Sequence, residues 1–208
     1  MKNAEFIKLK VCGMRQRENI LEVAGLRPDY MGFIFYKGSK RFVGNDFILP
    51  AEFPSGIKKV GVFVNASSME IQNLADKHTL DFIQLHGDES IDQCEELRNH
   101  GLRIIKVFGV SPNFNFKELT AYENVVDFFL FDTKVSSYGG SGISFDWTIL
   151  GKYHQRIPFF LSGGISPRNV EVVSDLKGMN LHALDVNSGV EREVGLKDTG
   201  LIRSLIDI

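Results

Sequence analysis

The chain has 208 residues, of which 43% are hydrophobic and 24% charged, and this length is enough for one domain with a sizeable core. Its formal net charge of −2 provides no basic field for a nucleic acid, and no apolar run approaches the roughly 20 residues that a membrane span needs. The first residues carry charges within a short apolar run, unlike a signal peptide, and two cysteines do not suggest a disulfide framework, so we expect a reduced, cytoplasmic protein without a membrane or nucleic-acid partner.

Eight apolar runs of strand length recur along the chain. They are continuous rather than alternating, which is typical of strands that are buried on both faces. The runs cover residues 7–11, 31–35, 60–64, 82–85, 104–107, 128–131, 159–161 and 183–186.

Amphipathic stretches with apolar residues at helical intervals follow most of these runs. They cover residues 17–24, 68–77, 90–99, 167–176 and 198–206. Ser90 is the expected N-cap of the third, and in the fourth Ser166 is the expected N-cap with Pro167 as the first helical residue. After Phe42 and after Phe145 the chain offers only short helical candidates.

Strands that alternate with helices predict a parallel sheet, and eight such units close into a (β/α)₈ barrel, or TIM barrel. The alternative is a doubly wound open sheet, but no GxGxxG follows the first run, which weakens its dinucleotide-binding version. No linker or low-complexity segment divides the chain, so residues 1–208 are predicted to form a single barrel domain. In such a barrel the residues directly after each strand are the candidate site residues.

Two glycine turns follow the seventh and eighth runs. Gly163 and Gly164 follow the seventh, and Ser188 and Gly189 follow the eighth. Small residues let bare backbone N–H groups approach an anion, and the last two strands of a barrel form a phosphate grip. Taken alone, the first turn is equally well explained as a tight connection that needs positive φ.

Cys12 and Gly13 follow the first run, where we expect the thiol to be exposed at the barrel mouth. Lys10 lies two residues earlier on the same face of the strand and would help to stabilise a thiolate. The alternative is a small, inert core residue.

A basic turn follows the second run. Arg41 carries a planar guanidinium, which can donate two parallel hydrogen bonds to one carboxylate. The alternative is a solvated loop, which is the preferred interpretation of Lys37 and Lys40.

The fourth and sixth runs end in His86 and Asp132. His86 is either a general base or a structural histidine at the rim. Asp132 ends the very apolar DFFLF run, where a partly desolvated carboxyl suits a general acid, although capping of a turn is the alternative. The glycine-rich loop that follows, with Gly140 and Gly142, is predicted to be a mobile lid that binds substrate. The other histidines show no metal-ligand spacing.

Together these motifs closely resemble the phosphoribosylanthranilate isomerase family of tryptophan biosynthesis. Each motif alone is weak, but eight in order at the expected barrel positions are specific. They are KVCGM at 10–14, MGFIFYKGSKRF at 31–42, VGVFVN at 60–65, QLHGDE at 84–89, FDTK at 131–134, YGGSGISFDW at 138–147, LSGGISPRNV at 161–170 and DVNSGVE at 185–191.

The resemblance implies an Amadori rearrangement of N-(5-phosphoribosyl)anthranilate to 1-(2-carboxyphenylamino)-1-deoxyribulose 5-phosphate, with no cofactor and no metal. It implies Cys12 as the general base and Asp132 as the general acid. It also implies that Arg41 meets the anthranilate carboxylate, that the glycine turns hold the phosphate, and that Asp185 bonds to the substrate near the reacting atoms. The partner is thus a phosphorylated small molecule, and the protein is expected to be a monomer or a homodimer.

Two positions depart from the family pattern. Asn187 stands where a second Ser is common, and the segment REVGLKD after Glu191 lacks the expected Pro-Gly, which leaves the conformation of the last loop open.

Other functions remain as alternatives. A sugar-phosphate epimerase would need metal-ligand His and Asp at several strand ends, where only His86 qualifies. An aldose–ketose isomerase of histidine synthesis would use paired aspartates after strands one and five, where Cys12 and Phe108-Gly109 stand. A non-catalytic phosphate-ligand binder would need neither Cys12 nor Asp132.

Overall fold

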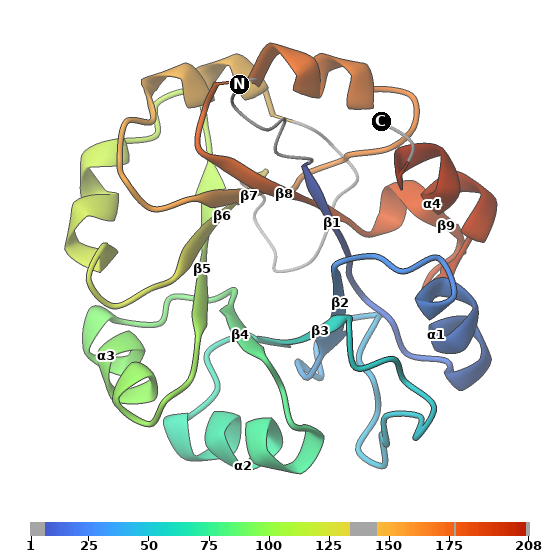
Figure 1. Ribbon diagram of the computed structural model, residues 1–208. Helices are drawn as coiled ribbons and strands as arrows, with labels where there is room; N and C mark the ends of the chain where they lie inside the picture. Colours follow the sequence, from blue (N-terminus) through green and yellow to red (C-terminus); the bar gives the residue numbers. More distant parts are fainter. Residues whose placement is uncertain (1–6, 134–144, 177, 207–208) are drawn as a thin grey trace.

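The computed structural model describes residues 7–133, 145–176 and 178–206. At its centre eight parallel strands close into a barrel, each strand hydrogen-bonded to the next and the eighth to the first (Figure 1). The closed barrel confirms the predicted TIM fold and excludes the doubly wound sheet. The strands are β1 (Lys8–Val11), β2 (Tyr30–Ile34), β3 (Lys58–Phe63), β4 (Phe82–Leu85), β5 (Ile104–Val110), β6 (Phe128–Thr133), β7 (Phe159–Leu161) and β8 (Leu181–Val186).

Helices surround the barrel on its outside (Figure 1). The α-helices are α1 (Arg17–Ala24), α2 (Ser68–His78), α3 (Ile91–Asn99) and α4 (Thr199–Ile206), and the 3₁₀ helices are η1 (Phe116–Tyr122), η2 (Trp147–Lys152), η3 (Val170–Leu176) and η4 (Ser188–Val190). A small antiparallel hairpin, β9 (Glu191–Glu193) and β10 (Leu196–Lys197), follows β8. No helix in the described ranges is both long and apolar enough to cross a bilayer.

The predicted α-helix cap after β4 is confirmed. The Ser90 hydroxyl accepts a hydrogen bond from the Gln93 N–H at 3.2 Å and so satisfies one unpaired donor of the first turn of α3. The helix predicted over residues 198–206 also forms, as α4, and Asp198, the first residue of that range, caps it. One carboxylate oxygen of Asp198 accepts from the N–H groups of Gly200 and Leu201.

The predicted helix from Pro167 is wrong in its start and type, although Ser166 caps the turn there as predicted. The Ser166 hydroxyl accepts from the Arg168 N–H at 3.3 Å and its carbonyl accepts from the Val170 N–H at 3.1 Å. The chain forms a turn over residues 167–169, and the 3₁₀ helix η3 begins only at Val170. The Asn169 side chain explains the difference, because its oxygen accepts from the Ser166 N–H and its amide donates to the Gly164 carbonyl. Local side-chain bonds of this kind compete with a helical start.

Two connections also differ from the sequence analysis. Strand β5 continues to Val110, so Phe108-Gly109 lies within the strand rather than at its end, with Gly109 opposite Asp132. A 3₁₀ helix, η1, follows it where no helix was predicted, started by Asn115, whose side chain accepts from the Lys117 N–H. Residues 35–57, after β2, contain turns and a single bridge but no helix.

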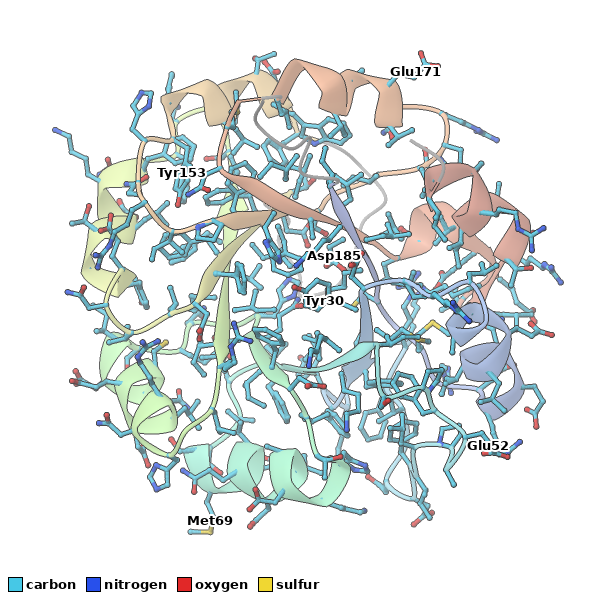
Figure 2. All side chains as sticks on the ribbon, viewed as in Figure 1. Tyr30, Glu52, Met69, Tyr153, Glu171 and Asp185 are labelled. Atoms are coloured by element: carbon cyan, nitrogen blue, oxygen red, sulfur yellow. The ribbon has the colours of Figure 1, made fainter. Side chains whose placement is uncertain are left out.

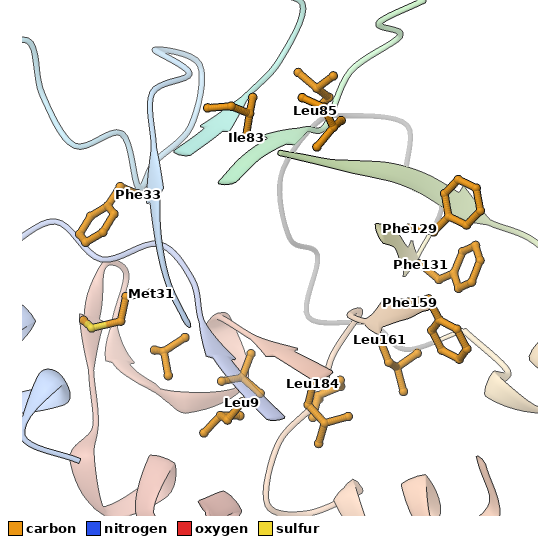
Figure 3. Packing of buried hydrophobic residues seen from close by; sticks show 14 of the residues in the cluster. Leu9, Met31, Phe33, Ile83, Leu85, Phe129, Phe131, Phe159, Leu161 and Leu184 are labelled. Carbon is orange, nitrogen blue, oxygen red and sulfur yellow. The ribbon is translucent and has the colours of Figure 1, made fainter. Parts of the chain in front are cut away.

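Successive residues of each strand face opposite sides of the barrel wall. On β6, Phe128 and Leu130 belong to the cluster inside the barrel, whereas Phe129 and Phe131 belong to the cluster between the barrel and its helices. The outward rings lie beside Phe159 of β7, and the centroids of Phe131 and Phe159 are 5.2 Å apart (Figure 3). Because both faces are apolar, the strands read as continuous hydrophobic runs.

Aromatic side chains fill the amino end of the barrel interior. Tyr30 lies at the middle of the barrel (Figure 2), and its ring meets that of Phe160 at 5.2 Å, which in turn meets Phe128 at 5.3 Å. His182 packs on Phe128 at 4.3 Å and its Nε2 lies 2.7 Å from the Tyr30 hydroxyl. Burial lowers the pKa of His182 to about 4. The barrel is therefore packed at this end, which leaves the carboxyl ends of the strands for a ligand.

Candidate active site

A cleft of about 770 Å³, counting solvent at its open side, lies at the carboxyl ends of the strands. Cys12, Arg41, Asp132 and Asp185 all line it, as do the two glycine turns. The structure thus brings these predicted site residues together. The remaining two predicted residues, Gly140 and Gly142, lie outside the described part of the chain.

Strand alternation explains why these side chains face the cleft. Asp132 is two residues beyond Leu130, and Asp185 is two residues beyond Ala183, and both of these apolar residues belong to the interior cluster. Asp185 accordingly lies at the centre of the barrel in Figure 2. The same alternation on β1 gives Lys10 and Cys12 one common face.

Lys10 and Asp185 form a buried ion pair on adjacent strands. Their residues stand opposite each other in the β1–β8 register, with 2.7 Å between Nζ and Oδ1 and side chains 0% and 6% exposed. Burial disfavours the Lys10 cation, but Asp185 and Cys12 together keep its pKa above the usual value. Burial also raises the pKa of Asp185, and Lys10 opposes this. The paired Lys10 and Asp185 side chains therefore lie beside Cys12, and Lys10 favours the ionised form of both neighbours.

Cys12 is buried, contrary to the expectation of an exposed thiol. It is 4% exposed because its N–H extends the ladder to the Val186 carbonyl and its side chain packs with Ile34 and Val62, yet it lines the cleft. A Cβ on Gly32 of β2 would come within 2.7 Å of its Sγ, so only glycine leaves room for it. Burial raises the pKa of the thiol; the Lys10 ammonium opposes that rise, as predicted, but does not outweigh it.

Asp132 lies at the end of β6 beside His86. One of its oxygens, Oδ1, accepts from the Thr133 N–H at 2.7 Å, and Oδ2 lies 3.5 Å from His86 Nε2. The other ring nitrogen of His86, Nδ1, is 3.1 Å from the amide nitrogen of Gln84, a buried residue of β4. The Gln84 amide nitrogen can donate to Nδ1 when the His86 proton is on Nε2, the nitrogen that faces the Asp132 side chain.

Arg41 is buried, which excludes the alternative of a solvated loop. Its Nε and Nη2 donate to the two oxygens of Glu191 at 2.8 and 2.6 Å, and it is 9% exposed. The hydrogen bond to Glu191 raises the pKa of Arg41 further above its usual value. The residues are 150 positions apart in sequence, and the pair joins the turn after β2 to the hairpin after β8.

The two glycine turns lie against each other. Gly163 and Gly164 have φ of +90° and +70°, which glycine adopts without strain. A Cβ on Gly189 would collide with the carbonyl oxygen of Ile165, so backbone packs directly on backbone. No described residue accepts a hydrogen bond from the N–H groups of these four turn residues. These donors are free to meet an anion.

The two departures from the family pattern meet at Lys197. Its buried ammonium donates to the side-chain oxygen of Asn187 at 2.6 Å and to the Asn187 carbonyl at 3.2 Å. The last loop is the β9–β10 hairpin, closed by a two-residue turn whose Gly195 has φ of +83°. The sequence analysis assigned no role to Glu191 or Lys197, although Glu191 ends the DVNSGVE motif and Lys197 lies in the REVGLKD segment that departs from the family pattern.

No group of three or more His, Cys, Asp or Glu among the described residues is arranged to hold a metal ion. Charged side chains at the cleft form ion pairs, Arg41 with Glu191 and Asp185 with Lys10.

Comparison with known proteins agrees with this arrangement. Residues 9–208 match the family described as N-(5'-phosphoribosyl)anthranilate (PRA) isomerase. The isomerase of this name from Parabacteroides distasonis is 44% identical over 204 residues, covering 95% of this chain and 91% of the relative, and that from Thermotoga neapolitana is 37% identical over 203 residues, covering 96% and 97%.

Solved structures agree too. The phosphoribosylanthranilate isomerase of Thermotoga maritima has a TM-score of 0.83 at 34% identity, covering 97% of this chain and 98% of its own. Another such isomerase, solved in complex with reduced 1-(o-carboxyphenylamino)-1-deoxyribulose 5-phosphate, has a TM-score of 0.80 at 32% identity, with 97% of each chain covered. The chain therefore belongs to the N-(5'-phosphoribosyl)anthranilate isomerase family and is an isomerase enzyme.

Proposed function

We propose that this isomerase converts N-(5-phosphoribosyl)anthranilate into 1-(2-carboxyphenylamino)-1-deoxyribulose 5-phosphate in tryptophan biosynthesis, with Asp132 as general acid and Cys12 as general base. The observation that carries the proposal is the convergence of both residues on one cleft, although β1 and β6 are separated in the barrel by β7 and β8. An acid and a base on different walls suit a reaction that handles two protons on one sugar.

The chemistry needs two proton transfers and no redox partner. Asp132 donates a proton to the furanose ring oxygen, so that the ring opens and the nitrogen lone pair forms an iminium. Cys12 then removes the proton from the neighbouring sugar carbon, and the resulting enolamine tautomerises to the ketone. Beyond these two catalytic transfers, the tautomerisation moves one proton onto C1 and one from the C2 hydroxyl. Substrate and product contain the same atoms, so the proton gained by Cys12 equals the one lost by Asp132, and it returns from the thiol to the carboxylate through solvent before the next turnover.

The surroundings of Cys12 suit a base that is used only when substrate is bound. Because burial raises the pKa of the thiol, little thiolate exists in the free enzyme near pH 7, but the thiolate that forms is correspondingly more basic. Lys10 stabilises this thiolate, and Asp185 keeps Lys10 charged. In the proposal Asp185 also bonds to the substrate near the reacting carbon.

The two ends of the substrate are held by different groups. The free N–H groups of the two glycine turns support a phosphate site, as backbone donors do in other barrels. At the other end Arg41 binds the anthranilate carboxylate. A guanidinium has five N–H donors, and Glu191 engages only Nε and Nη2, so the edge that carries Nη1 is left for a ligand.

Loss of phosphoribosylanthranilate fluorescence on addition of the purified protein tests the proposal, and we expect turnover without added metal or cofactor. A Cys12→Ser/Asp132→Asn double variant, purified in parallel, excludes a contaminating host isomerase. Turnover confined to ribulose 5-phosphate or to the histidine-pathway aminoaldose would contradict the proposal, and so would tight binding without turnover.

A further inference from the structure

A buried group of charged side chains lies beside Arg41, where the turn after β2 meets the hairpin after β8. We call Arg41, Glu191, Lys197 and Asn187 the Glu191 cluster. Glu191 and Lys197 have side chains 6% and 0% exposed, and Arg41 and Asn187 line the cleft. The mechanism above uses Arg41 but assigns nothing to Glu191 or Lys197.

Glu191 is the centre of this cluster. Its Oε2 accepts from Arg41 Nη2 at 2.6 Å, and its Oε1 accepts from Arg41 Nε, from Lys197 Nζ at 2.6 Å and from the Gly195 N–H at 3.1 Å. Although burial works against the carboxylate, its bonds to Arg41 and Lys197 keep the Glu191 pKa below the usual value. Glu191 is thus ionised and fully bonded, and it fixes two donors of one guanidinium edge.

Lys197 anchors the cluster to the rest of the fold. Its backbone is held on both sides by Asn19 of α1, whose Oδ1 accepts from the Lys197 N–H at 2.8 Å and whose amide donates to the Lys197 carbonyl at 3.0 Å. Its ammonium then reaches Glu191 and Asn187, the residue directly before the second glycine turn. The hairpin, the β8 loop and Arg41 are therefore positioned together.

The cluster also has an unbalanced charge. Arg41 carries a positive charge and Glu191 a negative one, while burial lowers the pKa of Lys197 and Glu191 opposes that change. With Lys197 protonated, the cluster holds one positive charge that it does not itself balance. Buried charges are stable when paired, and a carboxylate placed on the open edge of Arg41 would complete the balance. The neighbouring Lys10–Asp185 pair is neutral as a unit and does not supply this charge.

We propose that Glu191 is a positioning residue for substrate recognition, which holds the Arg41 fork so that its free edge meets the substrate carboxylate, and that Lys197 holds Glu191 in place. The inference rests on the proposed role of Arg41 in binding that carboxylate. In this proposal the carboxylate subsite consists of Arg41 together with the hairpin after β8, which supplies Glu191 and Lys197.

Glu191→Gln tests the proposal, because it keeps the size of the side chain and removes its charge. We expect KM to rise by about tenfold, equivalent to about 1.4 kcal/mol, with kcat changed by less than about threefold. Arg192→Gln is the matched control. It removes a charge from the same hairpin, but its side chain is 58% exposed and pairs with Asp198, so KM should stay the same.

A double-variant cycle separates positioning from general loosening of the fold. In an Arg41→Ala background, whose KM is already raised, Glu191→Gln should add less than about a further twofold to KM, because both changes remove the same interaction. With N-(5-phosphoribosyl)aniline, which lacks the carboxylate, wild type and Glu191→Gln should have equal KM. A fully additive effect on KM, or an equal loss on both substrates, would contradict the proposal.

These measurements test the carboxylate-binding role of Arg41 and the positioning role of Glu191 separately. If Arg41→Ala leaves KM unchanged, the proposed carboxylate role of Arg41 fails. If Arg41→Ala raises KM but Glu191→Gln does not, only the positioning role fails. If Glu191→Gln does not fold, Glu191→Asp is the second variant, because it keeps the negative charge on a side chain that is shorter by one methylene. It should raise KM several-fold for the anthranilate substrate and leave KM for the aniline substrate unchanged. An unchanged KM for the anthranilate substrate would overturn the proposal.

Discussion

Lys10, Cys12 and Asp185 share one buried corner of the cleft, and the pKa of each reflects burial first and then the charges of its neighbours. The lysine and the aspartate stabilise each other as ions, and the lysine partly offsets the cost of ionising the thiol. Cys12, as the proposed base, is protected from solvent and takes a proton only from a group brought against it. Gly32 makes this possible, because a larger residue there would occupy the position of the sulfur.

Substitutions at the two proposed catalytic residues should act on the rate and not on binding. Cys12→Ser and Asp132→Asn should each lower kcat by about 10²–10⁴ with KM nearly unchanged, as expected for loss of general base or acid catalysis. Steady-state kinetics on the fluorescent substrate measure both constants. Cys94→Ser is the control, because Cys94 is buried in α3 and does not line the cleft. Near wild-type kcat in either variant would remove that residue from the mechanism.

At the scale of elements, the end of β6 and the loops after β7 and β8 pack through glycines. The Gly163 backbone touches the end of β6, since a Cβ there would lie 2.5 Å from Thr133 Oγ1 and 3.2 Å from Asp132 Oδ1. The Gly189 backbone touches Ile165 of the preceding loop. The proposed phosphate site and the proposed acid are therefore in direct contact through backbone, and a change in one displaces the other.

Gly163→Ala should lower kcat by more than the accompanying loss of folding stability accounts for. The new Cβ must push Thr133 and Asp132 away, so we expect kcat to fall by about tenfold, equivalent to about 1.4 kcal/mol. Gly178→Ala is matched to it: φ is +94° there as well, but a Cβ meets nothing within 4 Å. Both variants should lose about 1–2 kcal/mol of stability from the left-handed backbone, and only the first should lose activity. Equal kcat in the two would show that the contact with β6 does not matter.

Across the whole molecule, the two ends of the barrel have different roles. The amino end is filled by rings of Tyr30, Phe128 and Phe160 around His182, while the carboxyl end is lined by the ionisable groups of the cleft. Stability and chemistry are thus separated along the barrel axis, as in other barrels of this class. A substitution at the amino end should alter unfolding without altering the kinetics.

His182 should make the fold sensitive to mild acid. Its pKa is about 4 in the folded chain and near 6.5 in the unfolded chain, so between these values the unfolded chain binds the extra proton. This contribution to stability is present above pH 6.5 and is lost as the pH falls toward 4. His182→Gln, which can still bond to the Tyr30 hydroxyl, should reduce the drop in urea midpoint between pH 7 and pH 5, with kcat and KM unchanged at pH 7. An identical drop in both proteins would exclude His182 as its source.

Much of the fold and the site was predictable from local sequence. The eight apolar runs, the cap at Ser90 and the turns with small residues depend on interactions within a few positions, and the structure confirms the barrel that they predict. The start of η3 was not predictable in the same way, because the side chain of Asn169 competes there with helical hydrogen bonds. The burial of Cys12 also required the structure, since it depends on β8 and β2 packing against β1.

The sequence by itself determined the number of strand units and the family resemblance, because hydrophobic runs and ordered motifs are properties of the chain; closure into a barrel was predicted, and the structure excluded the open sheet. It did not determine which alternate residues face the interior, because strands that are apolar on both faces carry no such signal. Nor did it determine the Glu191 cluster, since Arg41 and Glu191 are 150 positions apart and only barrel closure brings β2 and the hairpin after β8 together. Pairing of buried charges is a property of the tertiary structure, and here it decides how the cleft is charged.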